Sequence, residues 1–214
     1  MKQNVIDSIL EHKIIAIVRG VAESDIVATA GALAEGGIKL LEITFNQKDP
    51  NTLKNTATLI KMVNEKYGDQ ICIGAGTVMN PEQATAAFEA GAKYFISPNT
   101  NIAVIHTANN LGAVSIPGAL TPTESQAAFE AGADFVKLFP AGDLGIGYIK
   151  SVCAPLNHIP FLAVGGINSE NVADYLKTGI KGVGVGGNLV DLKAIANKDF
   201  KKLTALAKEY IANC

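Results

Sequence analysis

Lys137 stands in the setting that most strongly suggests covalent chemistry in this chain. Residues 135–140 (FVKLFP) form an apolar run with the length and composition of a buried strand. Side chains alternate across a strand, so Lys137 shares its face with Phe135 and Phe139. An ammonium is poorly solvated on such a face, which lowers the pKa of the amine and favours its attack on a substrate carbonyl. The plainer alternative is a lysine whose amine reaches water past the strand end.

Three more features fall late in strands or where strands should end. Glu42 is the one acid in its apolar strand, Arg19 ends the first strand, and Gly74-Ala75-Gly76-Thr77 ends the third. Small residues let a ligand approach the backbone closely. A lone acid and a lone lysine in apolar strands favour a catalytic pair. The structural alternative is a buried Glu42–Lys137 ion pair that only holds the strands together, although such pairs often add little stability.

Two Gly-Gly turns predict a second part of the site. They read VGGIN at 164–168 and VGGNL at 185–189, and each opens toward a helical pattern. Free backbone N–H groups at such turns, together with the positive end of a helix, bind anions. In a barrel of eight βα units, the loops after the last two strands are the common phosphate site. The sequence therefore predicts a small phosphorylated ligand whose carbonyl end reaches Lys137.

These residues must be positioned by an alternating series of strands and helices. The expected strands cover 14–18, 39–45, 71–78, 94–98, 114–117, 135–140, 161–164 and 182–185. The expected helices cover 2–12, 23–36, 51–67 and 80–91, then two that end near 112 and 132, and then 147–156, 168–179 and 200–211. Strands that alternate with helices are typical of a parallel α/β fold.

A repeated segment supports this reading. The sequence AAFEAGA occurs at 86–92 and again at 127–133, and each copy precedes a short apolar strand. The pattern predicts an α/β fold of the (β/α)8 TIM-barrel type, with a short N-terminal helix, in one domain over residues 1–214. An open doubly wound sheet is the alternative. No GxGxxG follows the first strand, so a dinucleotide-binding fold has little support.

Composition argues against several function classes. The chain has 214 residues, 48% hydrophobic content and a net charge of −2, which gives no basic surface for nucleic acid. No apolar run approaches the roughly 18 residues of a membrane span, and the start lacks a signal-peptide pattern, so a cytoplasmic protein is expected. The three cysteines are far apart and the three histidines lack metal-ligand spacing. We expect no metal, no cofactor and no nucleic-acid or membrane partner.

The chain closely resembles the 2-keto-3-deoxy-6-phosphogluconate (KDPG) / 4-hydroxy-2-oxoglutarate (KHG) aldolase family of class I aldolases. The resemblance runs nearly end to end. Its most specific segments are Leu41-Glu42-Ile43-Thr44, Gly74-Ala75-Gly76-Thr77-Val78, Ile96-Ser97-Pro98-Asn99, Ile116-Pro117-Gly118 and Val136-Lys137-Leu138-Phe139-Pro140-Ala141.

The resemblance implies a barrel, usually a homotrimer, that needs no metal. It places the Schiff-base lysine at Lys137 and the general acid/base at Glu42. The residues it implies for the substrate are Arg19, Thr77, Pro98, Phe139, Gly165, Gly166, Gly187 and Asn188, with Thr77 on the pyruvyl carboxylate and the glycine turns on the phosphate.

Two positions depart from the gluconate-specialised pattern of the family. Those members often carry arginine where this chain has Asn46, and threonine where it has Val164. Both departures resemble the branch that acts on the galactonate epimer, which keeps an arginine equivalent to Arg19 as a substrate ligand.

The expected function is class I cleavage of 2-dehydro-3-deoxy-6-phosphogluconate to pyruvate and glyceraldehyde 3-phosphate, together with cleavage of 4-hydroxy-2-oxoglutarate to pyruvate and glyoxylate. The first alternative is the same reaction on 2-dehydro-3-deoxy-6-phosphogalactonate. More distant alternatives are a sugar-phosphate isomerase or epimerase that uses Glu42 and Lys137 without a covalent intermediate, and a phosphometabolite-binding barrel with a structural lysine.

Overall fold

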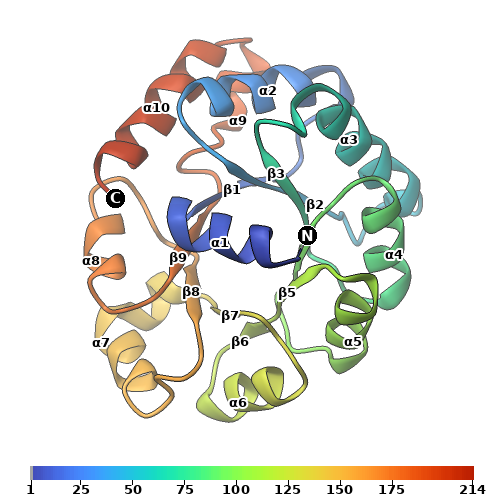
Figure 1. Cartoon of the computed structure of the whole chain (residues 1–214). Helices are drawn as coiled ribbons and strands as arrows, with labels where there is room; N and C mark the ends of the chain where they lie inside the picture. The colour runs from blue at the N-terminus through green and yellow to red at the C-terminus, as the bar shows by residue number, and fades with distance from the viewer. Residues whose placement is uncertain (1) are drawn as a thin grey trace.

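A ring of parallel strands inside a ring of helices makes up the fold, in a computed structural model that describes residues 2–214 (Figure 1). The strands are β1 (Ile14–Val18), β2 (Leu40–Thr44), β3 (Cys72–Gly76), β4 (Tyr94–Ile96), β5 (Val114–Ile116), β6 (Gly118–Ala119), β7 (Val136–Leu138), β8 (Phe161–Val164) and β9 (Gly182–Val185). The helices are α1 (Lys2–His12), α2 (Glu23–Glu35), α3 (Thr52–Tyr67), α4 (Pro81–Glu89), α5 (Ile102–Leu111), α6 (Pro122–Glu130), α7 (Ala141–Cys153), α8 (Val172–Leu176), α9 (Leu192–Ala196) and α10 (Phe200–Ala212).

The sheet closes on itself through β5 and β6. The strand order is β5-β4-β3-β2-β1-β9-β8-β7-β6, and every pairing is parallel. Only Pro117 separates β5 from β6, so the two are halves of one barrel strand. The first half pairs with β4 and the second with β7, which joins the two ends of the order. The predicted TIM barrel is confirmed, and the open sheet is wrong.

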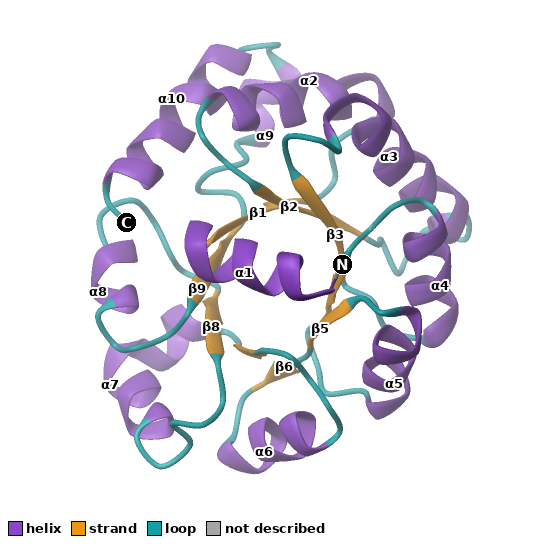
Figure 2. Cartoon of the chain, in the orientation of Figure 1, coloured by secondary structure: helices purple, strands orange, loops and turns teal. Residues whose placement is uncertain are grey.

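Apolar side chains fill both sides of this ring. The larger cluster packs the outer faces of the strands against the surrounding helices. A smaller cluster lies inside the barrel and includes Leu40, Tyr94 and Phe135. Helix α1 crosses the end of the barrel where the strands begin (Figures 1 and 2), and its Val5 and Ile9 pack into the inner cluster. That end is closed, so a ligand can enter only from the end where the strands stop.

Several helices differ from their predicted bounds. The expected helix 147–156 begins earlier, as α7 at Ala141, and is interrupted at Gly145, whose φ is 75°. Three glycines within 142–147 hid this start, because glycine is a poor helix former. The expected helix 168–179 is shorter in the structure, where only α8 is helical. Asn168 Oδ1 accepts hydrogen bonds from the backbone N–H groups of Glu170 and Asn171, so these residues form a turn instead of the first turn of a helix. The segment 193–208, which reads as amphipathic and helical, is divided between the short helix α9 and α10.

No helix within residues 2–214 combines the length and apolar character that crossing a bilayer requires.

Candidate active site

Lys137 points into the barrel from β7. Lys137 is 7% exposed. Phe135, two residues earlier and on the same face, belongs to the inner apolar cluster. Gly118 of β6 is its register partner on one side and Leu162 of β8 on the other. Burial is the largest influence on the amine and lowers its pKa. The amine therefore stays inside the barrel and does not reach bulk water.

Phe139 acts on this amine differently from the expectation. We predicted that Phe135 and Phe139 together would keep the lysine dry and neutral. Phe139 is instead 36% exposed, and its ring centroid lies 4.6 Å from Lys137 Nζ. A ring face in that position attracts the ammonium form, an interaction that we did not predict. Phe135 lies with other apolar side chains in the inner cluster and contributes to the burial of the amine.

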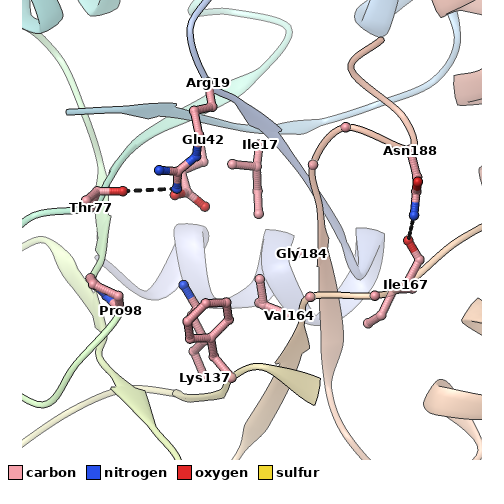
Figure 3. Close-up of a pocket in the computed structure, with 15 residues that line it drawn as sticks. Ile17, Arg19, Glu42, Thr77, Pro98, Lys137, Val164, Ile167, Gly184 and Asn188 are labelled. Carbon is pink, nitrogen blue, oxygen red and sulfur yellow. Dashed lines mark hydrogen bonds between the residues drawn. The ribbon is translucent and has the colours of Figure 1, made fainter. Parts of the chain in front are cut away.

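Glu42 faces Lys137 from the opposite wall of the barrel. In the strand order, β2 and β7 lie half a ring apart. Figure 3 shows the Glu42 carboxylate and the Lys137 amine pointing into the same space. Glu42 is 2% exposed, and within residues 2–214 its Oε2 has no hydrogen-bond partner. Burial raises the pKa of Glu42, while Lys137 and then Arg19 lower it.

The glycines of β3 make room for this carboxylate. An added Cβ at Gly76 would lie 1.6 Å from Glu42 Oε1, and one at Gly74 would meet the ring of Tyr94 at 2.2 Å. β3 has no side chain at these two inward positions, so Glu42 from β2 and Tyr94 from β4 lie over them. The small residues that we assigned to ligand approach therefore also seat the predicted acid/base.

The structural alternative of a Glu42–Lys137 ion pair is not formed. No Lys137 nitrogen to Glu42 oxygen distance falls within 4.0 Å. The two groups interact only across the space between the walls, where the carboxylate raises the pKa of Lys137 and Arg19 lowers it. A buried acid and a buried amine separated in this way leave room for a substrate between them.

Arg19 and Thr77 form a polar corner beside this space. A terminal nitrogen of Arg19 donates to Thr77 Oγ1 at 3.2 Å, as Figure 3 shows. Thr77 has a φ of 55°, a left-handed conformation that is uncommon for a β-branched residue. Asn46 does not join this corner, because its Oδ1 accepts the Lys48 backbone N–H within its own loop. Arg19 is thus the guanidinium available to an anionic group here.

The Gly-Gly turns form the other end of the site. Gly165 and Gly166 have φ values of 98° and 72°, conformations that suit glycine. Gly187 has open space where a side chain would be. Asn188 Nδ2 donates to the Ile167 carbonyl at 2.9 Å and so ties the two turns together. Since the helices that follow are short, backbone N–H groups rather than long helix dipoles would bind an anion here.

One cavity of about 280 Å³ is lined by every residue that the family resemblance assigned to catalysis or substrate binding. These are Arg19, Glu42, Thr77, Pro98, Lys137, Phe139, Gly165, Gly166, Gly187 and Asn188. Their roles remain predictions, but their placement in one cavity is a property of the fold.

Apolar and glycine residues complete the wall of the cavity. Ile17 and Gly184 were not predicted as part of the site, whereas Ile167 and Gly186 belong to the two predicted glycine turns. Alternation places Ile17 on the inward face of β1, a signal that could have identified it. Val164, noted only as a departure from the family pattern, also lines the cavity. Within residues 2–214, no three His, Cys, Asp or Glu side chains are arranged to bind a metal ion.

Comparisons with known proteins agree with this geometry. The family model described as KDPG and KHG aldolase matches residues 5–206. The 2-dehydro-3-deoxy-6-phosphogalactonate aldolase of Escherichia coli (strain K12) is 34% identical over 198 residues, which is 92% of this chain and 94% of the relative. A probable aldolase of the same name from Rhizobium meliloti (strain 1021) is 38% identical over 181 residues, 84% of this chain and 82% of the relative.

A solved structure of a KDPG aldolase is also similar to this chain. The KDPG aldolase of Legionella pneumophila, with pyruvate captured at low pH as a covalent carbinolamine intermediate, superposes with a TM-score of 0.82. It is 29% identical and covers 92% of this chain and 93% of its own. The resemblance predicted from the sequence is confirmed by these comparisons.

Proposed function

The chain belongs to the KDPG and KHG aldolase family of carbon–carbon lyases, and on that premise we propose that it cleaves a 2-keto-3-deoxy-6-phospho sugar acid to pyruvate and glyceraldehyde 3-phosphate. The observation that carries the proposal is the buried amine of Lys137 facing a buried carboxylate across a cavity that ends in two glycine turns. A cavity with the amine at one end and the glycine turns at the other suits a substrate that has a ketone at one end and a phosphate at the other.

The proposed reaction begins at Lys137. Its neutral amine attacks the C2 ketone to give a carbinolamine, which takes up one proton at its hydroxyl and loses water to form a protonated Schiff base. Glu42, as carboxylate, removes the proton of the C4 hydroxyl, and the C3–C4 electron pair moves into the iminium. The aldehyde leaves, Glu42 returns the proton to C3 of the enamine, and hydrolysis releases pyruvate and the free amine. The raised pKa of Glu42 suits a group that both accepts and donates this proton.

The ends of the substrate would be held by different parts of the cavity. Arg19 and Thr77 bind the carboxylate next to the ketone, in keeping with their hydrogen-bonded corner. Gly165, Gly166, Gly187 and Asn188 bind the phosphate. Pro98 and Phe139 line the space between them.

Within this reaction, the galactonate epimer is the better supported substrate. The gluconate epimer was the first expectation, but the two relatives described above carry the galactonate name. Asn46 faces its own loop, Val164 offers no hydroxyl to the cavity, and Arg19 lies in it, which is the pattern implied for the galactonate branch. The test is the kcat/KM for pyruvate release from both epimers and from 4-hydroxy-2-oxoglutarate. A preference for the gluconate epimer would contradict this choice.

Gly76→Ala is expected to slow cleavage by roughly 10²-fold, the scale of a 1 Å misplacement of a reacting group. The new methyl would overlap Glu42 Oε1, so the carboxylate must move while the fold is kept. The measurement is kcat for pyruvate release. Gly147→Ala is the control, because a side chain at this helical position meets open space; equal activity of both variants would contradict the assigned seat of Glu42.

Gly187→Asp is expected to raise KM for the phosphorylated substrate by roughly 10²-fold or more. Two like charges about 4 Å apart cost on the order of 4 kcal/mol near a protein surface. The open space at Gly187 admits the new side chain without a clash. Cleavage of unphosphorylated 4-hydroxy-2-oxoglutarate should change little. A parallel loss on both substrates would place the phosphate elsewhere.

Two earlier expectations complete the proposal. We infer that the protein acts as a homotrimer, as the resemblance implied, and in the cytoplasm, as the sequence pattern predicted. Light scattering on the purified protein would test the assembly, and a monomer would contradict it.

A further inference from the structure

The unusual backbone of Thr77 has a support that lies outside the cavity. Thr77 directly follows β3, and its φ of 55° is a conformation that β-branched residues rarely adopt. On either side the chain is held by the sheet: Gly76 O accepts the Phe45 N–H at 2.9 Å, and Val78 N–H donates to Ile96 O at 3.1 Å. The carbonyl of Thr77 therefore needs a partner of its own.

Gln47 supplies that partner. Its Nε2 donates to the Thr77 carbonyl at 2.8 Å, although Gln47 belongs to the loop after β2. Its Oε1 accepts a hydrogen bond from Gln83 Nε2 at 2.9 Å. Gln47 thus links the backbone of Thr77 to the first turn of α4.

Gln83 completes this hydrogen-bond network. It is only 3% exposed, and its Oε1 accepts the Met79 backbone N–H at 2.7 Å. The two amide side chains therefore hold the backbone at 77 and 79 from one side. A primary amide both donates and accepts, and each glutamine here uses both capacities. Neither glutamine lines the cavity, so neither touches a substrate.

We propose that Gln47 and Gln83 are positioning residues that hold Thr77 in its left-handed conformation and thereby aim its hydroxyl at Arg19. The inference rests on the proposed function, in which Arg19 and Thr77 bind the carboxylate of the pyruvyl group. Without the hydrogen bonds from Gln47 and Gln83, Thr77 relaxes toward an ordinary backbone conformation. Its Oγ1 then moves away from the position where it accepts the hydrogen bond from Arg19. The effect falls on binding of the pyruvyl group and spares the amine of Lys137.

The test measures how much pyruvate is needed to trap the protein with borohydride. Gln47→Ala is expected to raise the half-saturating pyruvate concentration about 5–10-fold, the scale of one lost hydrogen bond, with the same maximal yield of adduct. Gln47→Glu should do at least as much, because an ionised carboxylate cannot donate to the Thr77 carbonyl. Gln3→Ala is the matched control, since the Gln3 side chain donates to Asp7 on α1, at the far end of the barrel.

A double-mutant cycle distinguishes a positioning role of Gln47 from an effect on the stability of the fold alone. Thr77→Gly adopts the left-handed conformation without help and has no hydroxyl to aim. Gln47→Ala added to it should leave the half-saturating concentration unchanged. A lower melting temperature with normal half-saturation in Gln47→Ala, or equal effects in both backgrounds, would overturn the inference. If the unmodified protein traps no pyruvate at any concentration, the proposed function fails and this inference fails with it.

Discussion

Replacing Lys137 with alanine is expected to reduce turnover by on the order of 10⁵-fold or more, the scale seen when a covalent nucleophile is removed. The proposed reaction has no electron sink without the iminium that this amine forms. The cavity and its two ends would remain, because Lys137 forms no ion pair that the fold needs. The measurement is kcat for pyruvate release, with the melting temperature recorded beside it.

Two further variants make the result interpretable. Lys137→Met keeps a long stem at the buried position and removes the charge, so it should fold at least as well and remain inactive. Lys150→Ala removes an exposed lysine of α7 and should retain full activity. Residual turnover within 10²-fold of the unmodified protein in both Lys137 variants would contradict a covalent role for this amine.

Glu42→Gln is expected to slow cleavage by about 10²–10⁴-fold, the usual contribution of a positioned acid/base group, while pyruvate still adds covalently to Lys137. Glutamine matches glutamate in size and can lie over Gly76 in the same way. The measurements are single-turnover cleavage and borohydride trapping on the same sample. Loss of both would show that Glu42 is needed to form the Schiff base and not only to break the carbon bond.

The same variant carries a pH prediction with a definite sign. Burial lowers the pKa of Lys137, and the negative charge of Glu42 partly restores it. Removing that charge should lower the lysine pKa further, so the pH profile of the trapping rate moves to lower pH in Glu42→Gln. Arg19 lowers the same pKa, so Arg19→Gln should move the profile the other way. Shifts of the opposite sign would contradict the placement of these charges.

Most of the barrel could be predicted because its elements have local signals. Alternating strands and helices, glycine helix stops and the proline after Asn80 all act within a few residues of the chain. β6 was missed because it is two residues long and follows Pro117, a residue that usually ends a strand. Its identity as half of a barrel strand depends on pairing with β7, a contact that no local pattern encodes.

The site residues likewise divide into those with a local signal in the sequence and those that depend on contacts between distant segments. Lys137 and Glu42 were found because a charge inside an apolar strand is visible in the sequence. The Gly74 and Gly76 roles were only half predicted, because the side chains that lie over them come from neighbouring strands. Gln47 gave no local signal, since its partner is a backbone carbonyl of another loop. Gln83 was missed although it stands three residues after the N-cap Asn80, a position where glutamine often bonds the backbone at a helix start. The effect of the Phe139 ring depended on its rotamer, which the order of residues does not specify.

The most direct test of the central proposal is borohydride reduction in the presence of isotopically labelled pyruvate, followed by peptide mass mapping. We expect a pyruvate-derived mass on Lys137 alone, absent without pyruvate and absent in Lys137→Met. An isomerase or epimerase would instead exchange a substrate proton with solvent, and a binding protein would do neither. No adduct, or an adduct on a different lysine, would contradict the assignment of Lys137 as the Schiff-base residue.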